Sequence, residues 1–276
     1  MILVTGATGH VGRPLVDELL AAGQKVRALS RDPASADLPA EVEVAATADL
    51  PLDGVTSVFL VTAAFPGGAA EPIARMREAG VRRIVALSSY SVLDEDPKNM
   101  IGVKHRELER QIVDAGVEWT FPRPAGGFAA TALEWAEQIR TDGLARSPFR
   151  DAQTAPVHER DIAAVAARAL LTDDLVGETP LFSGPESLSY GDRARIIGEV
   201  TGEPVRFVEL THDEARLEWL HAGIPPHAVE ARLRMFAKLV GRPHELSPVA
   251  PFLGRPGLTF AQWVSDHANA FRKVTS

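Results

Sequence analysis

The start of the chain has the residue types and spacing of a phosphate-binding loop. Thr5-Gly6-Ala7-Thr8-Gly9-His10-Val11-Gly12 has the pattern Gly-x-x-Gly-x-x-Gly between an apolar run and an amphipathic stretch. In such a loop Gly6 allows a tight turn, Gly9 lets the backbone approach a pyrophosphate, and Gly12 packs the helix closely on the strand. The free N–H groups and the dipole of the following helix attract the phosphates. A purely structural glycine turn is the alternative, but the loop opens a β-α-β series, so we predict dinucleotide binding by Gly6, Thr8, Gly9, His10, Val11 and Gly12.

Charged residues after the second expected strand bear on which dinucleotide binds. The strand ends in Ser30-Arg31-Asp32-Pro33, so both signs of charge are present. An acidic residue here would hold a ribose 2′-hydroxyl, whereas an arginine would accommodate the 2′-phosphate of NADP. Asp32 can instead cap the turn that Pro33 begins, and Arg13 adds positive charge in the first helical turn. We predict NADP(H), the alternative being that Arg31 and Asp32 are merely solvated neighbours.

The usual proton donor for hydride transfer to a carbonyl is missing from the sequence. Such a transfer usually needs a donor near the developing oxyanion, which short-chain dehydrogenases supply as the tyrosine of Tyr-x-x-x-Lys. The fourth residue after Tyr90 is Asp94, and the fourth after Tyr190 is Ala194, so neither tyrosine belongs to this motif. The expected place reads Met100-Ile-Gly-Val-Lys104, in which only the lysine is present.

Lys104 is therefore a candidate site residue. As a functional group it would bind ribose hydroxyls and keep the site positive, and it is the catalytic candidate in this limited sense. The alternative is an exposed helix lysine that pairs with Glu107 or Glu109, which is common on protein surfaces.

Polar and aromatic residues near the ends of later strands complete the candidate site. Ligands of open α/β sheets bind outside the carboxyl ends of the strands. Thr62 and Ser88 end two expected strands, so we predict that they contact the cofactor. Tyr90 and Phe128 are candidates for contact with the substrate, although Ser88–Ser91 is equally consistent with ordinary loop composition.

The elements that would position these residues alternate in the first half of the chain. Apolar runs between amphipathic stretches indicate β-α-β units and a parallel sheet covered on both faces. The expected strands are Ile2–Thr5, Lys25–Ser30, Glu41–Ala45, Ser57–Thr62, Arg83–Ser88 and Glu118–Phe121. The expected helices are Val11–Ala22, Ala69–Ala79 and Val103–Ala115.

Beyond Pro122 the pattern becomes mainly helical. Thr211 and Glu214 have the spacing of a capping box at one of these helix starts. We predict an α/β fold, with a doubly wound parallel Rossmann sheet in residues 1–155 and a smaller, mainly helical C-terminal substrate lobe in residues 156–276. The expected later helices are Thr131–Ile139, Ile162–Leu171, Tyr190–Val200, Asp213–Ala222, Ala228–Val240 and Phe260–Phe271.

Composition excludes several classes of protein. The chain has 276 residues, is 45% hydrophobic, lacks cysteine and has a net charge of −8, which argues against a disulfide scaffold, thiolate metal sites and a grip on nucleic acid. Membrane spans need about 18 apolar residues, and no run approaches this length. Met1 leads straight into a strand rather than a signal peptide, so we expect a cytoplasmic protein. The eight histidines are scattered, and no metal site is expected.

Motifs of one known family occur in order along nearly the whole chain. The segments that carry them are Thr5–Gly12, Leu29–Pro33, Ile84–Ser89, Trp119–Pro124, Val157–Ala163 and Thr259–Val264. Together they resemble the NmrA-like branch of the atypical short-chain dehydrogenases, particularly its NAD(P)H:quinone-reductase-like members. The resemblance implies a Rossmann domain with a smaller C-terminal substrate lobe, NADP(H) as cofactor, and contact between Arg31 and the 2′-phosphate. Loss of the catalytic tyrosine is common in this branch, which fits Met100.

Two functions of different classes follow from this resemblance. The leading hypothesis is an NADPH-dependent reductase of a quinone or of a polycyclic aromatic carbonyl from natural-product biosynthesis, with a small aromatic substrate as its partner. Hydride addition to a quinone yields a delocalised hydroquinone anion, which can wait for a proton from water, so a fixed donor is dispensable. The alternative is a non-catalytic, NADP(H)-sensing regulatory protein of the NmrA type. An oligomeric partner stays open under either hypothesis.

Overall fold

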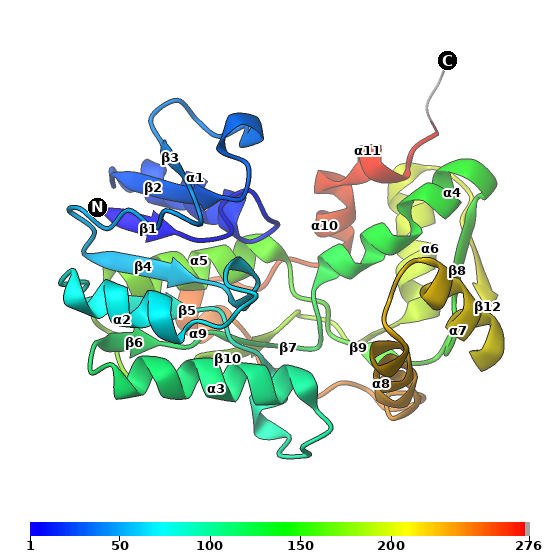
Figure 1. Cartoon of the computed structure of the whole chain (residues 1–276). Coiled ribbons are helices and arrows are strands. Elements are labelled where there is room, and N and C mark those ends of the chain that lie inside the picture. The colour runs from blue at the N-terminus through cyan, green and yellow to red at the C-terminus, as the bar shows by residue number, and fades with distance from the viewer. Residues whose placement is uncertain (274–276) are drawn as a thin grey trace. The chain divides into compact units, whose positions relative to one another are not determined.

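A six-stranded parallel sheet forms the centre of the first part of the chain in the computed structural model, which describes residues 1–273. Its strands lie in the order β3-β2-β1-β4-β5-β6 (Figure 1). Ile2 in β1 pairs with Val26 on one side and with Ser57 on the other, and the strand order reverses at this point. This is the doubly wound Rossmann order, so the predicted fold is confirmed. The strands are β1 (Ile2–Val4), β2 (Val26–Ser30), β3 (Glu43–Ala46), β4 (Ser57–Leu60), β5 (Arg83–Ala86) and β6 (Glu118–Thr120).

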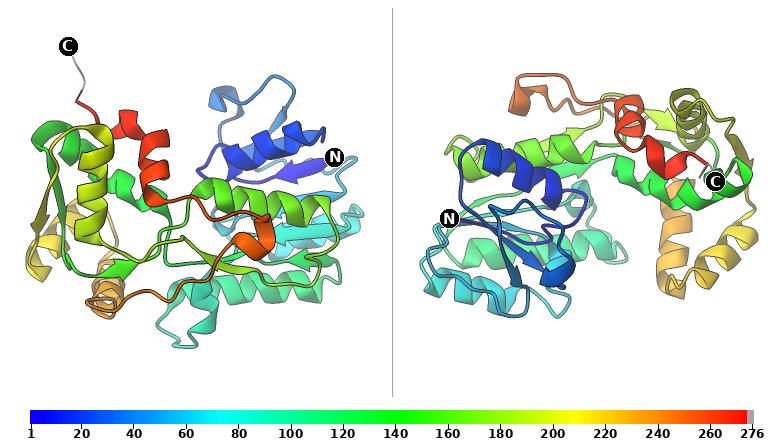
Figure 2. Two further views of the ribbon diagram at one scale, coloured as in Figure 1. Left: turned by 180° about the vertical axis from the view of Figure 1, so that it is seen from behind. Right: turned by 90° about the horizontal axis from the view of Figure 1, so that it is seen from above.

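Helices cover both faces of this sheet. On one face α1 packs against α5, and on the other α2 packs against α3, as the view from above in Figure 2 shows. Because helices cover both faces, β1, β4 and β5 are buried along their whole length. This burial explains why their sequences are mostly apolar. The helices are α1 (Gly12–Ala21), α2 (Ala70–Glu78), α3 (Met100–Asp114) and α5 (Glu159–Leu171), with short 3-10 turns η1 (Pro33–Ser35), η2 (Thr62–Ala64) and η3 (Tyr90–Leu93).

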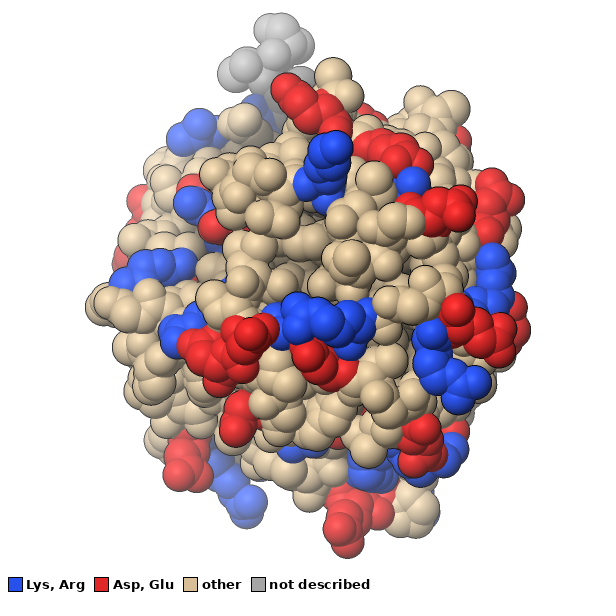
Figure 3. All heavy atoms as spheres, turned by 90° about the vertical axis from the view of Figure 1, so that its left-hand side faces the viewer, with Lys and Arg blue, Asp and Glu red and all other residues tan. Residues whose placement is uncertain are grey.

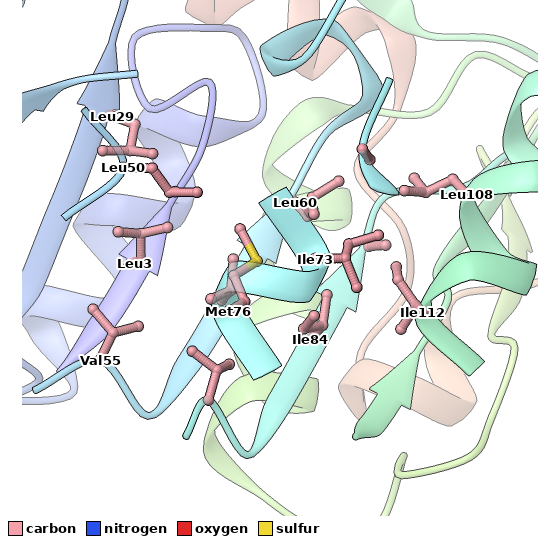
Figure 4. Packing of buried hydrophobic residues seen from close by; sticks show 14 of the residues in the cluster. Leu3, Leu29, Leu50, Val55, Leu60, Ile73, Met76, Ile84, Leu108 and Ile112 are labelled. Carbon is pink, nitrogen blue, oxygen red and sulfur yellow. The ribbon is translucent and has the colours of Figure 1, made fainter. Parts of the chain in front are cut away.

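One layer of the core of this part lies between the sheet and helices α2 and α3. Figure 4 shows side chains from both helices pointing toward those of the strands. Because each of these side chains is almost completely removed from water, their burial is a main source of the stability that holds the strand ends in place. The labelled members are Leu3, Leu29, Leu50, Val55, Leu60, Ile73, Met76, Ile84, Leu108 and Ile112.

Helix α5 returns to the sheet after a long excursion of the chain, and a buried arginine holds its end there. Arg83, at the start of β5, donates hydrogen bonds to the backbone oxygens of Ala169 (3.0 Å) and Thr172 (2.5 Å). It also donates to the carboxylate of Glu118 at 2.8 Å. A buried guanidinium needs partners for its donors, so this network fixes the end of α5 beside β5.

The chain forms two compact units, and each unit is built from several separate segments rather than from one side of a boundary after residue 155. The first unit holds residues 1–124, 159–182 and 251–254, and the second holds residues 125–158, 183–250 and those from 255 onward. The difference arises because α5 follows that boundary in sequence but has a wide apolar face that packs on the Rossmann sheet. Three of the passages from one unit to the other lie within short elements. These elements are the paired strands β7 (Arg123–Ala125) and β10 (Leu181–Ser183), and the helix α9 (Ala250–Leu253).

The second unit is mainly helical, as expected, and has its own core. The capping box of Thr211 and Glu214 is present at the start of α7. Two short sheets, β8 with β12 and β9 with β11, are not predicted from the sequence. Strands of only a few residues show no clear alternation of apolar and polar residues. The elements are η4 (Ala129–Trp135), α4 (Ala136–Asp142), β8 (Leu144–Ser147), β9 (Gln153–Thr154), β11 (Leu188–Ser189), α6 (Tyr190–Thr201), β12 (Arg206–Glu209), α7 (His212–His221), α8 (Pro226–Ala237), α10 (Phe260–Asp266) and α11 (Ala268–Phe271).

The surface carries mixed charge. On the face seen in Figure 3, acidic and basic side chains are interspersed among uncharged residues. Such a face does not present the continuous positive field that would attract a polyanion. Among residues 1–273, no helix combines the length and the apolar character needed to cross a membrane.

Candidate cofactor and active site

The glycine loop is folded so tightly that no side chain fits at Gly12. Gly6 has a φ of +61°, and its carbonyl oxygen accepts a hydrogen bond from the N–H of Gly9 at 2.9 Å. A Cβ atom placed on Gly12 would lie 2.1 Å from the same oxygen and 2.7 Å from the Cα of Ala7. The absence of a side chain at Gly12 therefore lets α1 start directly beneath the loop, as the sequence pattern predicts.

The first turn of α1 is open to an anion. No side chain caps this helix, and its first turn holds no acidic residue. Thr8, Gly9 and His10 are exposed, whereas Val11 and Gly12 are buried and offer only their backbone. Within this turn the Arg13 N–H donates to the backbone oxygen of Gly9 at 3.0 Å and Pro14 has no N–H, so the turn offers an anion chiefly the positive end of the helix dipole, which faces the exposed loop.

The charged residues after β2 have different roles in the structure. The Asp32 carboxylate accepts hydrogen bonds from the N–H of Ala34 (3.2 Å) and the hydroxyl of Ser35 (2.7 Å), so it caps η1 as expected. Arg31 is exposed, and within residues 1–273 its side chain makes no hydrogen bond or ion pair. Arg13 makes an exposed ion pair with Asp37 at 3.5 Å. The end of β2 therefore presents a free guanidinium, and its nearest acid in sequence is already used.

The ends of β4 and β5 are fastened to neighbouring segments. The Thr5 hydroxyl accepts a hydrogen bond from the N–H of Val61 at 2.9 Å, which fixes the chain just before the half-buried Thr62. Ser88 is buried, and its hydroxyl donates to Glu109 at 2.5 Å. The direct contact of Ser88 with the cofactor stays a prediction, because its donor is used inside the protein.

Glu109, which binds the candidate site residue Ser88, and its partner Arg123 are not singled out as functional by sequence reasoning. Arg123 donates to Glu109 from Nε (3.0 Å) and from Nη2 (2.6 Å), and so holds the carboxylate that receives the Ser88 hydroxyl. The available signal was the position of Glu109 between Leu108 and Ile112, on the apolar face of α3. A charged residue on a buried face needs a partner, and here the partner follows β6.

Lys104 is exposed, and it does not pair with Glu107 or Glu109, the two acids expected as its partners on a helix surface. Glu107 is bound by Arg110, and Glu109 is bound by Arg123. In the part of the chain that the structure describes, Lys104 has no hydrogen-bond or ion-pair partner. Its positive charge is therefore available to a ligand.

The aromatic candidates fall into two groups. Tyr90 lies in η3 with 47% of its surface exposed, and Phe128 lies in the second unit with 38% exposed, so both are accessible. Tyr190 is buried, with its ring edge-on to those of Trp135 and Phe236. Tyr190 is therefore a core residue rather than an accessible proton donor. The same burial raises the pKa of its hydroxyl.

Comparison with known proteins decides the family. A family model described as NAD(P)H-binding matches residues 6–173. The chain belongs to this NAD(P)H-binding family. The expected resemblance to NmrA-like atypical short-chain dehydrogenases is thereby confirmed.

Curated relatives of this NAD(P)H-binding chain are reductases. The (4-alkanoyl-5-oxo-2,5-dihydrofuran-3-yl)methyl phosphate reductase of Streptomyces griseus is 39% identical over 98% of this chain and 99% of its own. The NAD(P)H azoreductase of Xenophilus azovorans is 32% identical over the same shares of the two chains. The protein is therefore an NAD(P)H-dependent oxidoreductase.

Solved structures share the fold of this oxidoreductase. The NADPH-dependent quinone oxidoreductase of Escherichia coli superposes with a TM-score of 0.77 at 23% identity, over 97% of this chain and 99% of that chain. The triphenylmethane reductase of Citrobacter sp., complexed with NADP(H), gives a TM-score of 0.75 at 18% identity, over 97% of this chain and 100% of that chain.

We expect the substitution Gly12→Ala to disrupt cofactor binding. The added Cβ meets backbone atoms on two sides, so the loop must move away from the helix start, at a cost of about 1–3 kcal/mol in the free energy of unfolding. Denaturant unfolding and NADPH titration measure both effects. Gly67→Ala is the control, because a Cβ there meets nothing within 4 Å. Equal NADPH affinity in the two variants would contradict the role assigned to the loop.

The substitution Lys104→Ala should weaken NADPH binding while leaving the fold intact. Loss of a charged hydrogen bond to a ribose would raise the NADPH Kd by about 10-fold, with a smaller change in kcat at saturating cofactor. Lys25→Ala, which removes an exposed lysine just before β2, is the matched control. Unchanged affinity in Lys104→Ala would reduce this lysine to a surface residue.

Proposed function

We propose that this oxidoreductase reduces a quinone or a related polycyclic aromatic carbonyl at the expense of NADPH and without a tyrosine proton donor. The observation that carries the proposal is the exposed Met100, one helical turn before the free Lys104, at the place where a proton-donating tyrosine would stand. NADPH, when bound, supplies the hydride. Lys104 stabilises negative charge near the ribose and substrate but does not need to deliver a proton.

The chemistry of the acceptor supports this choice. A simple ketone would become a localised alkoxide, which needs a proton donor in the transition state. A quinone becomes an aromatic hydroquinone anion whose charge is spread over the ring system. Lys104 and the open end of α1 provide the positive field for such an anion, and water can complete the proton transfer.

The names of the relatives support a conjugated acceptor in general. The relatives and similar folds are named for an azo group, a quinone and an oxo-dihydrofuran that carries an alkanoyl group. Addition of hydride to any of these conjugated groups leaves a delocalised anion. We therefore propose a small conjugated substrate, with a polycyclic aromatic natural product as one member of the class, and place the reaction in the cytoplasm, where NADPH is regenerated.

The free Arg31 supports NADPH over NADH. Asp32, which in an NAD-specific site would hold the 2′-hydroxyl, is engaged in capping η1. Arg31 is thus left to bind the 2′-phosphate. Arg13, in the first turn of α1, is a second basic residue for this phosphate.

Turnover with quinones tests the proposal directly. Purified protein should oxidise NADPH in the presence of at least one member of a panel that runs from para-benzoquinone to phenanthrenequinone, followed by the absorbance of the reduced nicotinamide. Simple cyclic ketones should give no measurable rate. NADPH binding without turnover on any quinone would instead favour a cofactor-sensing regulatory protein.

The substitution Arg31→Ala tests the choice of cofactor. Loss of the contact with the 2′-phosphate should raise the NADPH Kd by about 10-fold to 100-fold and leave the NADH Kd nearly unchanged, because NADH lacks that phosphate. Arg206→Ala removes an exposed arginine from β12 in the second unit and is the control. Equal losses for NADPH and NADH would place Arg31 outside the 2′-phosphate site.

A further inference from the structure

Large apolar side chains gather on the surface where η3 meets the start of α3. Tyr90 (47% exposed) and Leu93 (54%) come from η3, and Met100 (52%) and Ile101 (54%) come from the first turn of α3. The two elements pack against each other. We call these four residues the apolar patch. Exposed apolar residues that cluster in this way are typical of a binding surface, whereas single ones are ordinary.

A network of hydrogen bonds holds the two elements of the patch together. The Asn99 side-chain amide donates to the backbone oxygens of Ser91 (2.8 Å) and Asp94 (3.1 Å). Its oxygen accepts from the N–H of Gly102 at 3.0 Å and so caps α3. One side chain thus starts the helix and fastens the preceding segment to it.

Close approach of the backbones makes this junction rigid. A Cβ on Gly102 would lie 2.3 Å from the backbone oxygen of Ser91, so η3 contacts α3 at a point where only glycine fits. Arg106, one turn later on the helix, donates to the backbone oxygens of Val92 (3.0 Å) and Asp94 (2.8 Å). These backbone oxygens are thus bonded within the junction, whereas three of the four side chains of the apolar patch stay more than half exposed.

The patch lies at the edge of the candidate active site. η3 follows directly after the carboxyl end of β5, the side of an open parallel sheet at which ligands bind. Met100 and Lys104 are four residues apart on α3, so they occupy the same face of the helix. A substrate near Lys104 is therefore within reach of the patch.

We propose that the apolar patch binds the fused-ring part of the acceptor and sets the preference of the enzyme for extended, apolar substrates. This inference rests on the proposed function. The Tyr90 ring offers an offset stacking surface, and the Met100 thioether makes favourable contacts with aromatic rings. Leu93 and Ile101 add dispersion contacts. At the position of the usual tyrosine, Met100 thus supplies an apolar contact to the ring in place of a proton.

The test compares two quinones of different size on one pair of variants. Leu93→Gln and Ile101→Gln replace exposed apolar side chains of the patch with a polar one, and because neither side chain is buried the fold is retained. We expect kcat/KM for phenanthrenequinone to fall by about 10-fold in each variant, since half-exposed side chains lose their contact with the outer rings. The value for para-benzoquinone, which has no outer ring, should change by less than about twofold.

A control on the same helix separates the patch from general effects of surface polarity. Val113 is 46% exposed near the other end of α3, and Val113→Gln should leave both values of kcat/KM unchanged. The NADPH Kd should be the same in all variants. A changed Kd would overturn the inference, because the loss would then arise at the cofactor site.

The remaining outcomes are distinct. If the wild-type protein reduces neither quinone, the proposed function fails and this inference fails with it. If it reduces both, and the variants lose activity equally on the large and the small quinone, only the inference fails. If Leu93→Gln and Ile101→Gln instead lower the mass measured by sedimentation and leave both rates intact, the patch is a contact between copies of the chain and the inference is overturned.

Discussion

The distance between the first helix and the glycine loop constrains the candidate phosphate site. A Cβ on Gly12 has no room beside the carbonyl oxygen of Gly6, so α1 begins immediately below the loop. That closeness aims the start of the helix at the exposed residues of the loop. The position of Arg31 has a different origin. Because β2 pairs with β1 in a parallel register and ends at Ser30, Arg31 leaves the sheet at the edge where β1 also ends.

The carboxylates of the first unit explain why its two candidate cations are available. Three acids near Arg31 or Lys104 in the sequence have other partners: Asp32 caps η1, Glu107 is bound by Arg110, and Glu109 is bound by Arg123 and Ser88. An exposed ion pair contributes little to stability, so little is lost by leaving a lysine or an arginine unpaired in water. A free cation beside a phosphate or a developing anion contributes far more.

The sequence predicts the parts of the structure that depend on local pattern. The six strands of the Rossmann sheet, the glycine loop and the cap at Asp32 follow from runs of a few residues, and each lies within a residue or two of its expected place. The pairing of Glu109 with Arg123 and the contact of Ser91 with Gly102 join residues that are distant in the chain, and no local rule indicates them. The sequence pattern predicts the start of α3 at Val103, three residues late, because Gly102 is unfavourable inside a helix. The structure shows why a glycine stands there: the backbone oxygen of Ser91 leaves no room for a Cβ.

The return of α5 to the Rossmann sheet has a consequence for how the polypeptide can be divided. Because residues 159–182 complete the first unit, the residues between them and residue 124 form an insertion whose two ends are both anchored in that unit. A single proteolytic cut within the insertion would leave α5 on the C-terminal fragment but still packed on α1 and bound by Arg83. The two fragments would stay together without a covalent link, and neither unit could be released by one cleavage.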